Sequence, residues 1–363
     1  MFVAWRDLRF AKGRFALMGT VVVLITLLVG LLSGLTAGLA RENTSAVTGL
    51  DADRLAFAAP PDGRSVSFTD SNVEESAWRS WAGRPGVSRA EPLGIRTLDA
   101  AAGEGRRTSA VSAFGIEPDG GLAPAGARVG PGKVVLSEQA AEDLGAGAGD
   151  RLRLGPAEFA VAAVAGDASY SHTPVVWTSL DDWQRLGGDG AARERHATVI
   201  ALTTTGGADL AAGDRAAGTS TLTLADSLTA IGSYQAENGS LQLMRGFLFA
   251  ISALVIGAFF TVWTIQRSGD VAVLKALGAS TGYLLRDALG QAVVMLALGT
   301  GAGTLLASGI GALISGGAVP FVLDAATVLV PAAVMIVLGA VGAALSIRRI
   351  TAVDPLTALG SAR

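Results

Sequence analysis

The chain has 363 residues, of which 50% are hydrophobic and 16% are charged. Soluble domains carry about 25% charged residues, so this composition is that of a membrane protein. A net charge of −3 without a basic cluster excludes nucleic acid as a partner. The absence of cysteine excludes disulfides, thiolate metal sites and cysteine catalysis.

The amino-terminal segment predicts a membrane span behind a cytoplasmic flank. Residues 1–14 carry four basic side chains and one acidic side chain, and residues 15–40 carry no charge. A span needs about 20 apolar residues, so we expect 15–40 to cross the membrane and 1–14 to be an amphipathic cytoplasmic segment. A cleaved signal peptide is the alternative, but its apolar core is usually about 7–15 residues long. Gly30, Gly34 and Gly38 share one face, which predicts the close approach of another helix.

Residues 41–240 are predicted to form an extracytoplasmic α+β domain between the first and second spans. This length is sufficient for a hydrophobic core of its own. Ser137 is placed to cap a helix at 138–144, and the glycine- and proline-rich stretch 120–132 is interpreted as a divide between two lobes. Strands are expected at 54–58, 87–98, 108–116, 133–136, 150–154, 158–164, 175–177 and 198–203, and helices at 72–82, 138–144 and 180–186.

Three further apolar segments predict spans at 241–265, 283–314 and 325–347. The helical pattern of the second span begins before its apolar part, a continuity suited to transmitting motion between the domain and the membrane. Three inner segments, 1–14, 266–286 and 348–363, hold ten basic residues, whereas the outer turn 315–324 holds none. This asymmetry predicts that both ends, including the tail 348–363, are cytoplasmic. The expected fold is therefore an α-helical membrane protein with four transmembrane helices and one inserted extracytoplasmic domain.

The inner turn at 266–282 joins a polar stretch to a short amphipathic one, VAVLKALGAS. A membrane helix, a basic turn, a short helix and a return helix make a structure on which a cytoplasmic partner can push. An interfacial helix without a partner is the alternative.

Catalytic signatures are missing from the sequence. There is no G-x-x-x-x-G-K-[ST] to hold a nucleotide and no H-E-x-x-H to hold zinc. The two histidines, His172 and His196, are interpreted as loop residues of the outer domain, although His172 beside Tyr170 is placed to touch a ligand. No acid–base or nucleophile set is found, so the chain is not expected to be an enzyme.

Three stretches resemble a known family. QRSGDVAVLKALGAS and the ending VDPLTALG are similar to the MacB/FtsX-like permeases of ABC transporters, and the segment from GKVVLSEQAAEDL to SLDDWQRL resembles their core periplasmic domain. The likeness covers nearly the whole chain, and the stretch 266–279 is its most specific part. More narrowly, SYQAENGSLQLMRGFLFAISALVIGAFF resembles the HrtB- and DevC-type haem exporter permeases.

This resemblance implies a homodimeric permease in the bacterial cytoplasmic (inner) membrane that binds two copies of a separate ATPase. ATP and magnesium would belong to that partner, and the permease would have no intrinsic cofactor. ATP-driven closure would move the inner helix ends and expel a hydrophobic substrate, haem on the narrower resemblance, from the outer leaflet. Gly278 would end the coupling helix as a cap. The coupling residues so implied are Gln266, Arg267, Asp270, Leu274, Lys275 and Gly278.

The substrate site is expected at the outer membrane boundary. A carboxylate near the bilayer edge is costly unless it is exposed or paired, which singles out Glu237. Two copies of Glu237 in a dimer would bind haem iron, with Tyr234 stacking or ligating. The alternative is a solvated Glu237 paired with Arg245, about two turns along the helix. The candidate substrate-binding residues are Glu237, Tyr234, Met244 and Arg245, and weaker ones are Arg41, Glu42 and Asn43.

Two other functions remain open from the sequence. One is an FtsX-like mechanotransmission permease that acts on an extracytoplasmic partner without transporting a substrate. The other is a lipid or peptide exporter.

Overall fold

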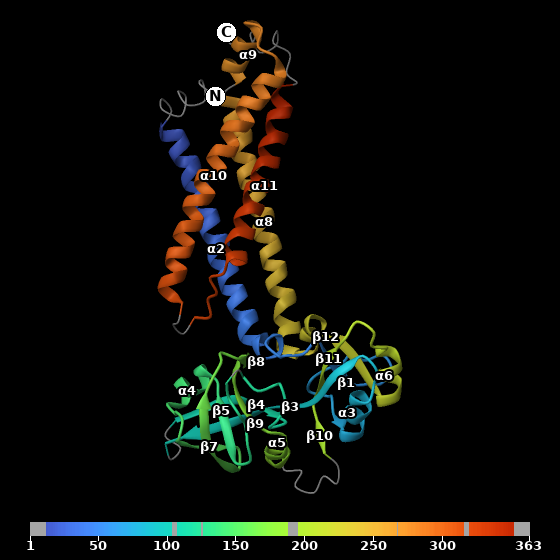
Figure 1. Ribbon diagram of the computed structural model, residues 1–363. Helices are drawn as coiled ribbons and strands as arrows, with labels where there is room; N and C mark the ends of the chain where they lie inside the picture. The colour runs from blue at the N-terminus through green and yellow to red at the C-terminus, as the bar shows by residue number, and fades with distance from the viewer. Residues whose placement is uncertain are drawn as a thin grey trace. The chain divides into compact units, whose positions relative to one another are not determined.

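The computed structural model describes residues 12–103, 107–124, 126–187, 195–266, 268–315 and 319–351 (Figure 1). The chain divides into two compact units. The helical unit comprises Met1–Gly38 and Ser240–Arg363, and the α+β unit comprises Leu39–Gly239. Most of the expected cytoplasmic ends, 1–14 and 348–363, lie outside the described residues.

Four long helices in the described part of the chain are apolar enough to cross a membrane, as the sequence predicts. They are α2 (Lys12–Thr48), α8 (Gly232–Gln266), α10 (Thr281–Ile314) and α11 (Ala325–Thr351). A short helix, α9 (Ser268–Ala276), stands between α8 and α10. Both α2 and α8 extend beyond their apolar segments into residues of the α+β unit.

Close packing of α2 against α10 depends on small residues. A Cβ built at Gly303 would lie 2.6 Å from the carbonyl oxygen of Val23 and 2.7 Å from Thr26 Cβ. A Cβ at Gly30 of α2 would lie 2.8 Å from Ala307 Cβ. Small residues let two helix backbones approach closely in lipid, so Gly30 has the role expected for it.

The expectation that another helix packs closely is wrong for Gly34 and Gly38, because a loop and not a helix packs against them. The ring of Phe321 fills the space beside Gly34, and the backbone of Pro320 lies against Gly38. The Val322 N–H donates to the Gly34 carbonyl at 3.1 Å. The glycine stripe of α2 therefore contacts a helix at one end and a folded-back loop at the other.

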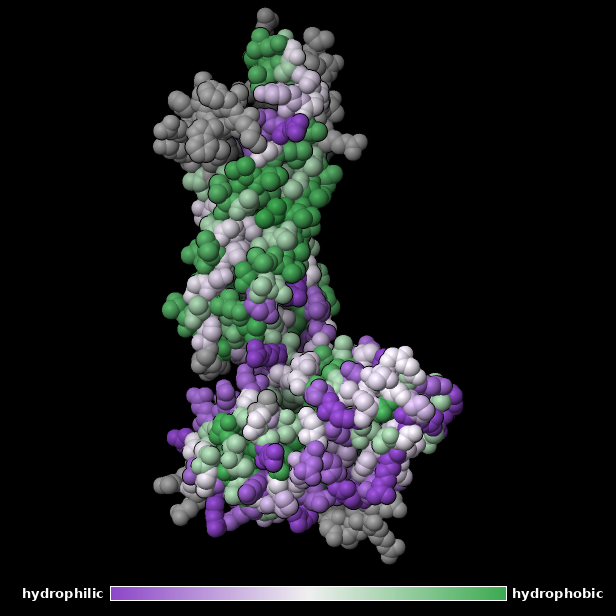
Figure 2. Space-filling model, viewed as in Figure 1, coloured by the Kyte–Doolittle hydropathy of each residue, from purple (hydrophilic) through white to green (hydrophobic). Residues whose placement is uncertain are grey.

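Large apolar side chains cover the outside of the helical unit (Figure 2). Leu254, Leu305 and Leu313 are 72%, 75% and 87% exposed. An apolar surface of this extent is stable when lipid covers it. Inside the unit, the helices share a core of Met18, Val22, Val29, Ile256, Phe260, Trp263, Ala292, Leu296, Met335 and Ala343.

The α+β unit is built on one ten-stranded sheet, in the order β12-β1-β11-β3-β4-β9-β5-β7-β6 with β8 beside β9. Its pairs are antiparallel except β4–β9 and β5–β7. The strands are β1 (Arg54–Ala58), β3 (Val87–Ala102), β4 (Arg107–Ile116), β5 (Lys133–Leu136), β6 (Arg151–Leu154), β7 (Ala157–Val164), β8 (Ser169–Tyr170), β9 (Thr173–Ser179), β11 (Val199–Thr204) and β12 (Thr219–Thr223). A separate ladder pairs β2 (Val73–Glu74) with β10 (His196–Ala197).

The 16-residue strand β3 is shared by both parts of the sheet, which contradicts the expected division at 120–132 (Figure 1). It pairs with β11 near its start, with β4 over 94–102 and with β6 at 100–102. Strands from before and after 120–132 lie side by side, as in β4–β9. The loop composition indicated a break in the chain, but it carried no information about which strands pair.

Helices cover both faces of the sheet, so alternate strand residues enter different cores. On β11, Ile200 and Leu202 belong to one core, and Val199 and Ala201 belong to the other. The expected cap of Ser137 is confirmed, since its hydroxyl accepts from Ala140 N–H at 3.3 Å. The helices are α3 (Glu75–Ala82), α4 (Glu138–Leu144), α5 (Leu180–Leu186), α6 (Leu210–Ala217) and α7 (Leu224–Ser227).

The elements α6 and β12 are among those that were not expected from the sequence. Gly213 lies inside α6, and glycine weakens the local preference for helix. The structure explains this glycine, because the ring of Trp81 fills the space that a side chain at 213 would need. Trp81 is 1% exposed and donates through Nε1 to Thr219 Oγ1 of β12 at 3.1 Å. Tertiary packing thus selects a helix that propensity alone does not favour.

Candidate functional site

A two-residue turn between β8 and β9 carries unusual backbone strain. Ser169 pairs with Pro174 and Tyr170 with Thr173, which leaves Ser171 and His172 as the turn. Their φ angles are 51° and 62°, the only left-handed non-glycine residues in the described part of the chain. Hairpin turns with two positive φ angles favour Asn-Gly, and each non-glycine residue there costs about 1–3 kcal/mol. The surrounding structure must therefore hold this turn in place.

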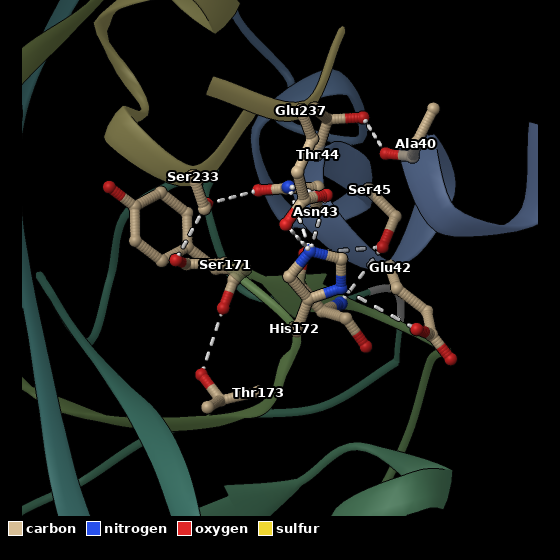
Figure 3. Close-up of polar contacts among 12 residues, drawn as sticks. Ala40, Glu42, Asn43, Thr44, Ser45, Ser171, His172, Thr173, Ser233 and Glu237 are labelled. Atoms are coloured by element: carbon tan, nitrogen blue, oxygen red, sulfur yellow. Dashed lines mark hydrogen bonds and ion pairs between the residues drawn. The ribbon is translucent and has the colours of Figure 1, made fainter. Parts of the chain in front are cut away.

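The end of α2 holds the turn (Figure 3). The Ser171 N–H donates to the Asn43 carbonyl at 3.1 Å, and the His172 N–H donates to the Glu42 carbonyl at 3.3 Å. The hydroxyls of Ser171 and Ser233, from the start of α8, share a hydrogen bond at 2.8 Å. Residues from α2, α8 and the hairpin thus converge on one point of the α+β unit.

The imidazole of His172 meets two carboxylates and an amide there (Figure 3). Its Nε2 lies 2.9 and 3.0 Å from the two carboxylate oxygens of Glu237. Asn43 Nδ2 lies 3.0 Å from the same nitrogen and donates to Glu237 Oε2 at 3.3 Å. On the other side of the ring, Nδ1 lies 3.6 Å from a carboxylate oxygen of Glu42. We name His172, Glu237, Asn43 and Glu42 the His172 cluster.

The side chains of the His172 cluster are held in fixed directions but remain partly exposed to solvent. Asn43 is 1% exposed, and its Oδ1 accepts from the Ser233 hydroxyl at 2.7 Å, which fixes the direction of its amide. The side chains of His172 and Glu237 remain 30% and 41% exposed. An incoming ligand can therefore reach the nitrogen and carboxylate electron pairs by replacing the hydrogen bond between them.

The described residues contain no group of three or more acidic or histidine side chains arranged to hold a metal ion. Iron in a porphyrin needs fewer protein ligands than a free ion, since the macrocycle fills four coordination positions and the protein supplies one or two axial ligands.

The sequence-predicted substrate residues lie along α8. Glu237 belongs to the His172 cluster, and its carboxylate accepts from Asn43, whereas the alternative interpretation paired it with Arg245. Tyr234, one turn earlier, is half-buried against the core that contains Phe68 and Tyr170. Met244, 51% exposed, and Arg245 lie farther along α8 in the helical unit.

His172 is the residue that the sequence did not single out strongly enough. It lies in a turn as expected, but it contacts three side chains and is not an isolated loop residue. Neighbouring Tyr170 is an anchor, since its ring packs edge-on against Phe68 and Phe114 at 5.6 and 5.8 Å. Burial raises the pKa of the Tyr170 phenol far above its usual range, so it stays neutral.

The predicted coupling segment forms α9 and its cap. The Ala279 N–H donates to the Leu274 carbonyl at 2.9 Å, and the Gly278 N–H donates to the Lys275 carbonyl at 3.0 Å. With φ 93° at Gly278, this is the glycine cap that the sequence predicts. Gln266 ends α8, Asp270 lies in α9, and Arg267 lies outside the described residues.

Apolar side chains near the end of α9 face outward. Leu277 is 79% exposed, Val273 54% and Leu274 38%. Their expected use as a contact surface for a partner fits this exposure and stays a prediction.

Four apolar helices with an α+β unit inserted between the first and second define a multi-pass membrane protein with one large extramembrane domain. The model of the MacB-like periplasmic core domain matches residues 15–220, and that of the FtsX-like permease C-terminal domain matches residues 243–355. The chain therefore belongs to the MacB/FtsX-like family of ABC transporter permeases. Its location is the inner membrane, with the large domain extracytoplasmic.

Among curated relatives, a protein of Staphylococcus epidermidis named as hemin transport system permease HrtB is 31% identical over 143 residues, 39% of this chain and 41% of that protein. One with the same name from Staphylococcus haemolyticus is 38% identical over 133 residues, 36% and 37% of the two chains. The match thus spans about two fifths of the length of these relatives. An ABC transporter permease of Mycobacterium bovis is 25% identical over 375 residues, 99% of both chains.

Solved structures give weak matches. The extracellular domain of the noncanonical ABC-type transporter YknZ from Gram-positive bacteria has a TM-score of 0.36 at 14% identity, covering 48% of this chain and 99% of that one. The periplasmic region of MacB from Actinobacillus actinomycetemcomitans has a TM-score of 0.37 at 12% identity, covering 50% and 92%. At these TM-scores neither structure bears on function.

Proposed function

We propose that the chain is the permease subunit of a MacB-like (type VII) ABC exporter that expels haem from the outer leaflet. A separate ATPase, two copies bound to a permease homodimer, would supply the energy from ATP and magnesium. The relatives named as hemin transport permeases support haem as the substrate. The observation that carries the proposal is the partly exposed pair of Glu237, near the start of α8, and His172, in the turn between β8 and β9.

The pair suits a transported iron porphyrin. Glu237 can offer a carboxylate oxygen to iron, whereas His172 can offer Nε2 only when that nitrogen carries no proton and its hydrogen bond of 2.9 Å to Glu237 has opened. The strained turn and Asn43 hold both side chains in place, which lowers the ordering cost of binding. Tyr234, one turn before Glu237, would stack on the porphyrin or ligate it. Such exchangeable contacts suit a substrate that must also leave.

Energy would enter at α9. The exposed side chains of Val273, Leu274 and Leu277 form a short apolar surface near the end of a helix between two membrane-spanning helices. An amphipathic helix of this kind fits an apolar groove on a partner protein. In the proposed complex that groove belongs to the ATPase, and Lys275 and Asp270 add charged contacts at its edge.

Haem retention in cells tests this function. Cells loaded with haemin are expected to keep several-fold less haem when the permease is expressed with its ATPase. Cells with Glu237→Gln should keep as much as cells without the permease, because the amide is a poor iron ligand. Gln235→Ala, an exposed change on the same helix, serves as control. Equal haem content with and without the wild-type permease would contradict haem export and point to a lipid or peptide substrate.

Mechanotransmission is the second candidate, and helix continuity favours it. Helices α2 and α8 each contain residues of both units, and Asn43 and Glu237 join them through His172. Movement of the inner helix ends would then alter the α+β unit and its partner without any transported substrate. Haemin would have no effect on the ATPase rate in that case.

A further inference from the structure

A hollow of about 480 Å³ lies in the α+β unit beside the middle of β3. It occupies a gap in the sheet, because β11 leaves β3 at Leu93 and β6 joins it only at Ala100. Between these points, β4 is the one described strand paired with β3. Drug-sized ligands occupy hollows of about 300–1,000 Å³, so this volume suits a small organic molecule.

The open edge of β3 presents backbone polar groups to the hollow. The Ile95 N–H donates to Thr198 Oγ1 at 2.8 Å, and the Asp99 carbonyl accepts from the Gly155 N–H at 3.0 Å. Peptide groups alternate between the two edges of an antiparallel strand, so those of Thr97 lie on this same edge. Thr97 and Thr198 both line the hollow, which therefore contains a backbone donor and acceptor beside a hydroxyl.

Arg96 stands over a rigid platform at the same place. The cross-strand residues Gly94 and Gly115 leave room for the indole of Trp183, which is 4% exposed. The Arg96 guanidinium carbon lies 4.9 Å from the centre of that ring, in a cation–π contact. Stacking fixes the plane of the guanidinium and leaves its edge donors available for hydrogen bonds.

The charge of Arg96 is not neutralised by a carboxylate in the described part of the chain. By contrast, Arg89 pairs with Asp51 at 2.7 Å and Arg195 with Glu117 at 2.9 Å. Among the residues that the structure describes, no Asp or Glu lines the hollow, whereas aromatic side chains such as Phe68 do. Hydroxyl and amide side chains, among them Thr69, Ser71 and Asn72, share the lining with the aromatic ones. A permanent cation beside such a mixed wall favours an organic anion whose body has both apolar and polar groups.

We propose that this hollow binds an organic carboxylate with an apolar body, a class that includes the free carboxyl end of an extended peptide. The Arg96 guanidinium holds the carboxylate, the Thr97 peptide groups bind a polar group next to it, and the apolar body lies against the aromatic wall. The lining of this hollow contains none of the proposed haem ligands, and the proposal does not depend on them.

Calorimetric titration of the purified full-length permease with a matched pair of ligands tests the proposal. N-acetylphenylalanine carries the carboxylate, and N-acetylphenylalaninamide replaces it with a neutral amide of the same size. The acid is expected to bind saturably and the amide at least about tenfold more weakly, because a charged hydrogen bond to Arg96 is lost. Equal affinity for acid and amide, or no saturable binding of the acid, would overturn the proposal.

Variants locate the binding site. Arg96→Gln is expected to lower the affinity for the acid about tenfold and leave that for the amide unchanged. Arg151→Gln, which removes an arginine whose side chain is 85% exposed, is the control. Far-ultraviolet circular dichroism checks that each variant is folded, and a folded Arg96→Gln variant with wild-type affinity would refute the assignment. A peptide that ends in a free phenylalanine carboxylate distinguishes a small organic acid from a peptide end as the source of the carboxylate. If the peptide binds more tightly than the single amino acid derivative, the ligand is a peptide end.

Discussion

Gly303→Leu is expected to disrupt the helical unit more than any other single change considered for that unit. The new side chain would meet the Val23 carbonyl and Thr26 within 2.7 Å of its Cβ, where α2 and α10 are in contact. Neither a backbone atom nor a residue on a packed helix can move away easily, so the helices must separate. Overpacking of this kind costs about 3 kcal/mol. The measurement is thermal unfolding of the detergent-purified protein, followed by tryptophan fluorescence and size-exclusion profile.

Gly301→Leu provides the matched control for that change. It lies two residues away on the same helix, and a Cβ there has nothing within 4 Å. The leucine at 301 would face lipid, and the melting temperature should stay close to that of the wild type. Similar melting temperatures for the two variants would show that α2 and α10 do not pack as described.

Leu277→Glu is expected to abolish coupling to the ATPase while leaving the permease folded. Leu277 is 79% exposed, so the change disturbs little within the chain itself. In the proposed complex the same side chain is buried in an apolar groove, where an unpaired carboxylate is strongly unfavourable. Copurification of the ATPase and its stimulation by the permease should both fall by more than about tenfold, as for a central interface residue.

Leu277→Met is the control for this second prediction, since it keeps an apolar side chain of similar volume. It should copurify with the ATPase as the wild type does. If the Leu277→Glu permease still retained and stimulated its ATPase, α9 would not be the contact surface, and the coupling proposal would fail.

Local signals predicted much of the secondary structure. The ranges expected for β1, β5, α4 and α5 agree with the structure residue for residue. The two helices have a serine that caps the first turn and a glycine after the last, and these signals act within a few residues. Uncharged apolar runs likewise predicted the four long helices.

The topology of the sheet could not be read in the same way. The stretch 120–132 has the composition of a divide between lobes, yet β4 before it lies next to β9 after it. The glycine stripe of α2 likewise did not reveal its packing partner, because Phe321 and not a helix fills the space beside Gly34. Which partner fills a small-residue surface depends on where a short loop returns.

The candidate site was predicted in part. Glu237 stood out as a carboxylate near the bilayer edge, and Asn43 and Glu42 as neighbours of that edge. His172 received less weight, because its role depends on contacts with Asn43 and Glu237, 194 residues apart in the sequence. Its left-handed backbone was also not evident, since Ser-His lacks the Asn-Gly signature of such turns.

Titration of the purified permease–ATPase complex with haemin, reading the Soret band and the ATPase rate together, tests the central claim most directly. Haem export predicts a saturable Soret shift and a faster ATPase. Glu237→Gln should weaken haemin binding by about tenfold or more without loss of the complex, and the Gln235→Ala control should not. The absence of a saturable shift, or equal haemin affinity in the Glu237→Gln and wild-type complexes, would contradict a haem site at the start of α8.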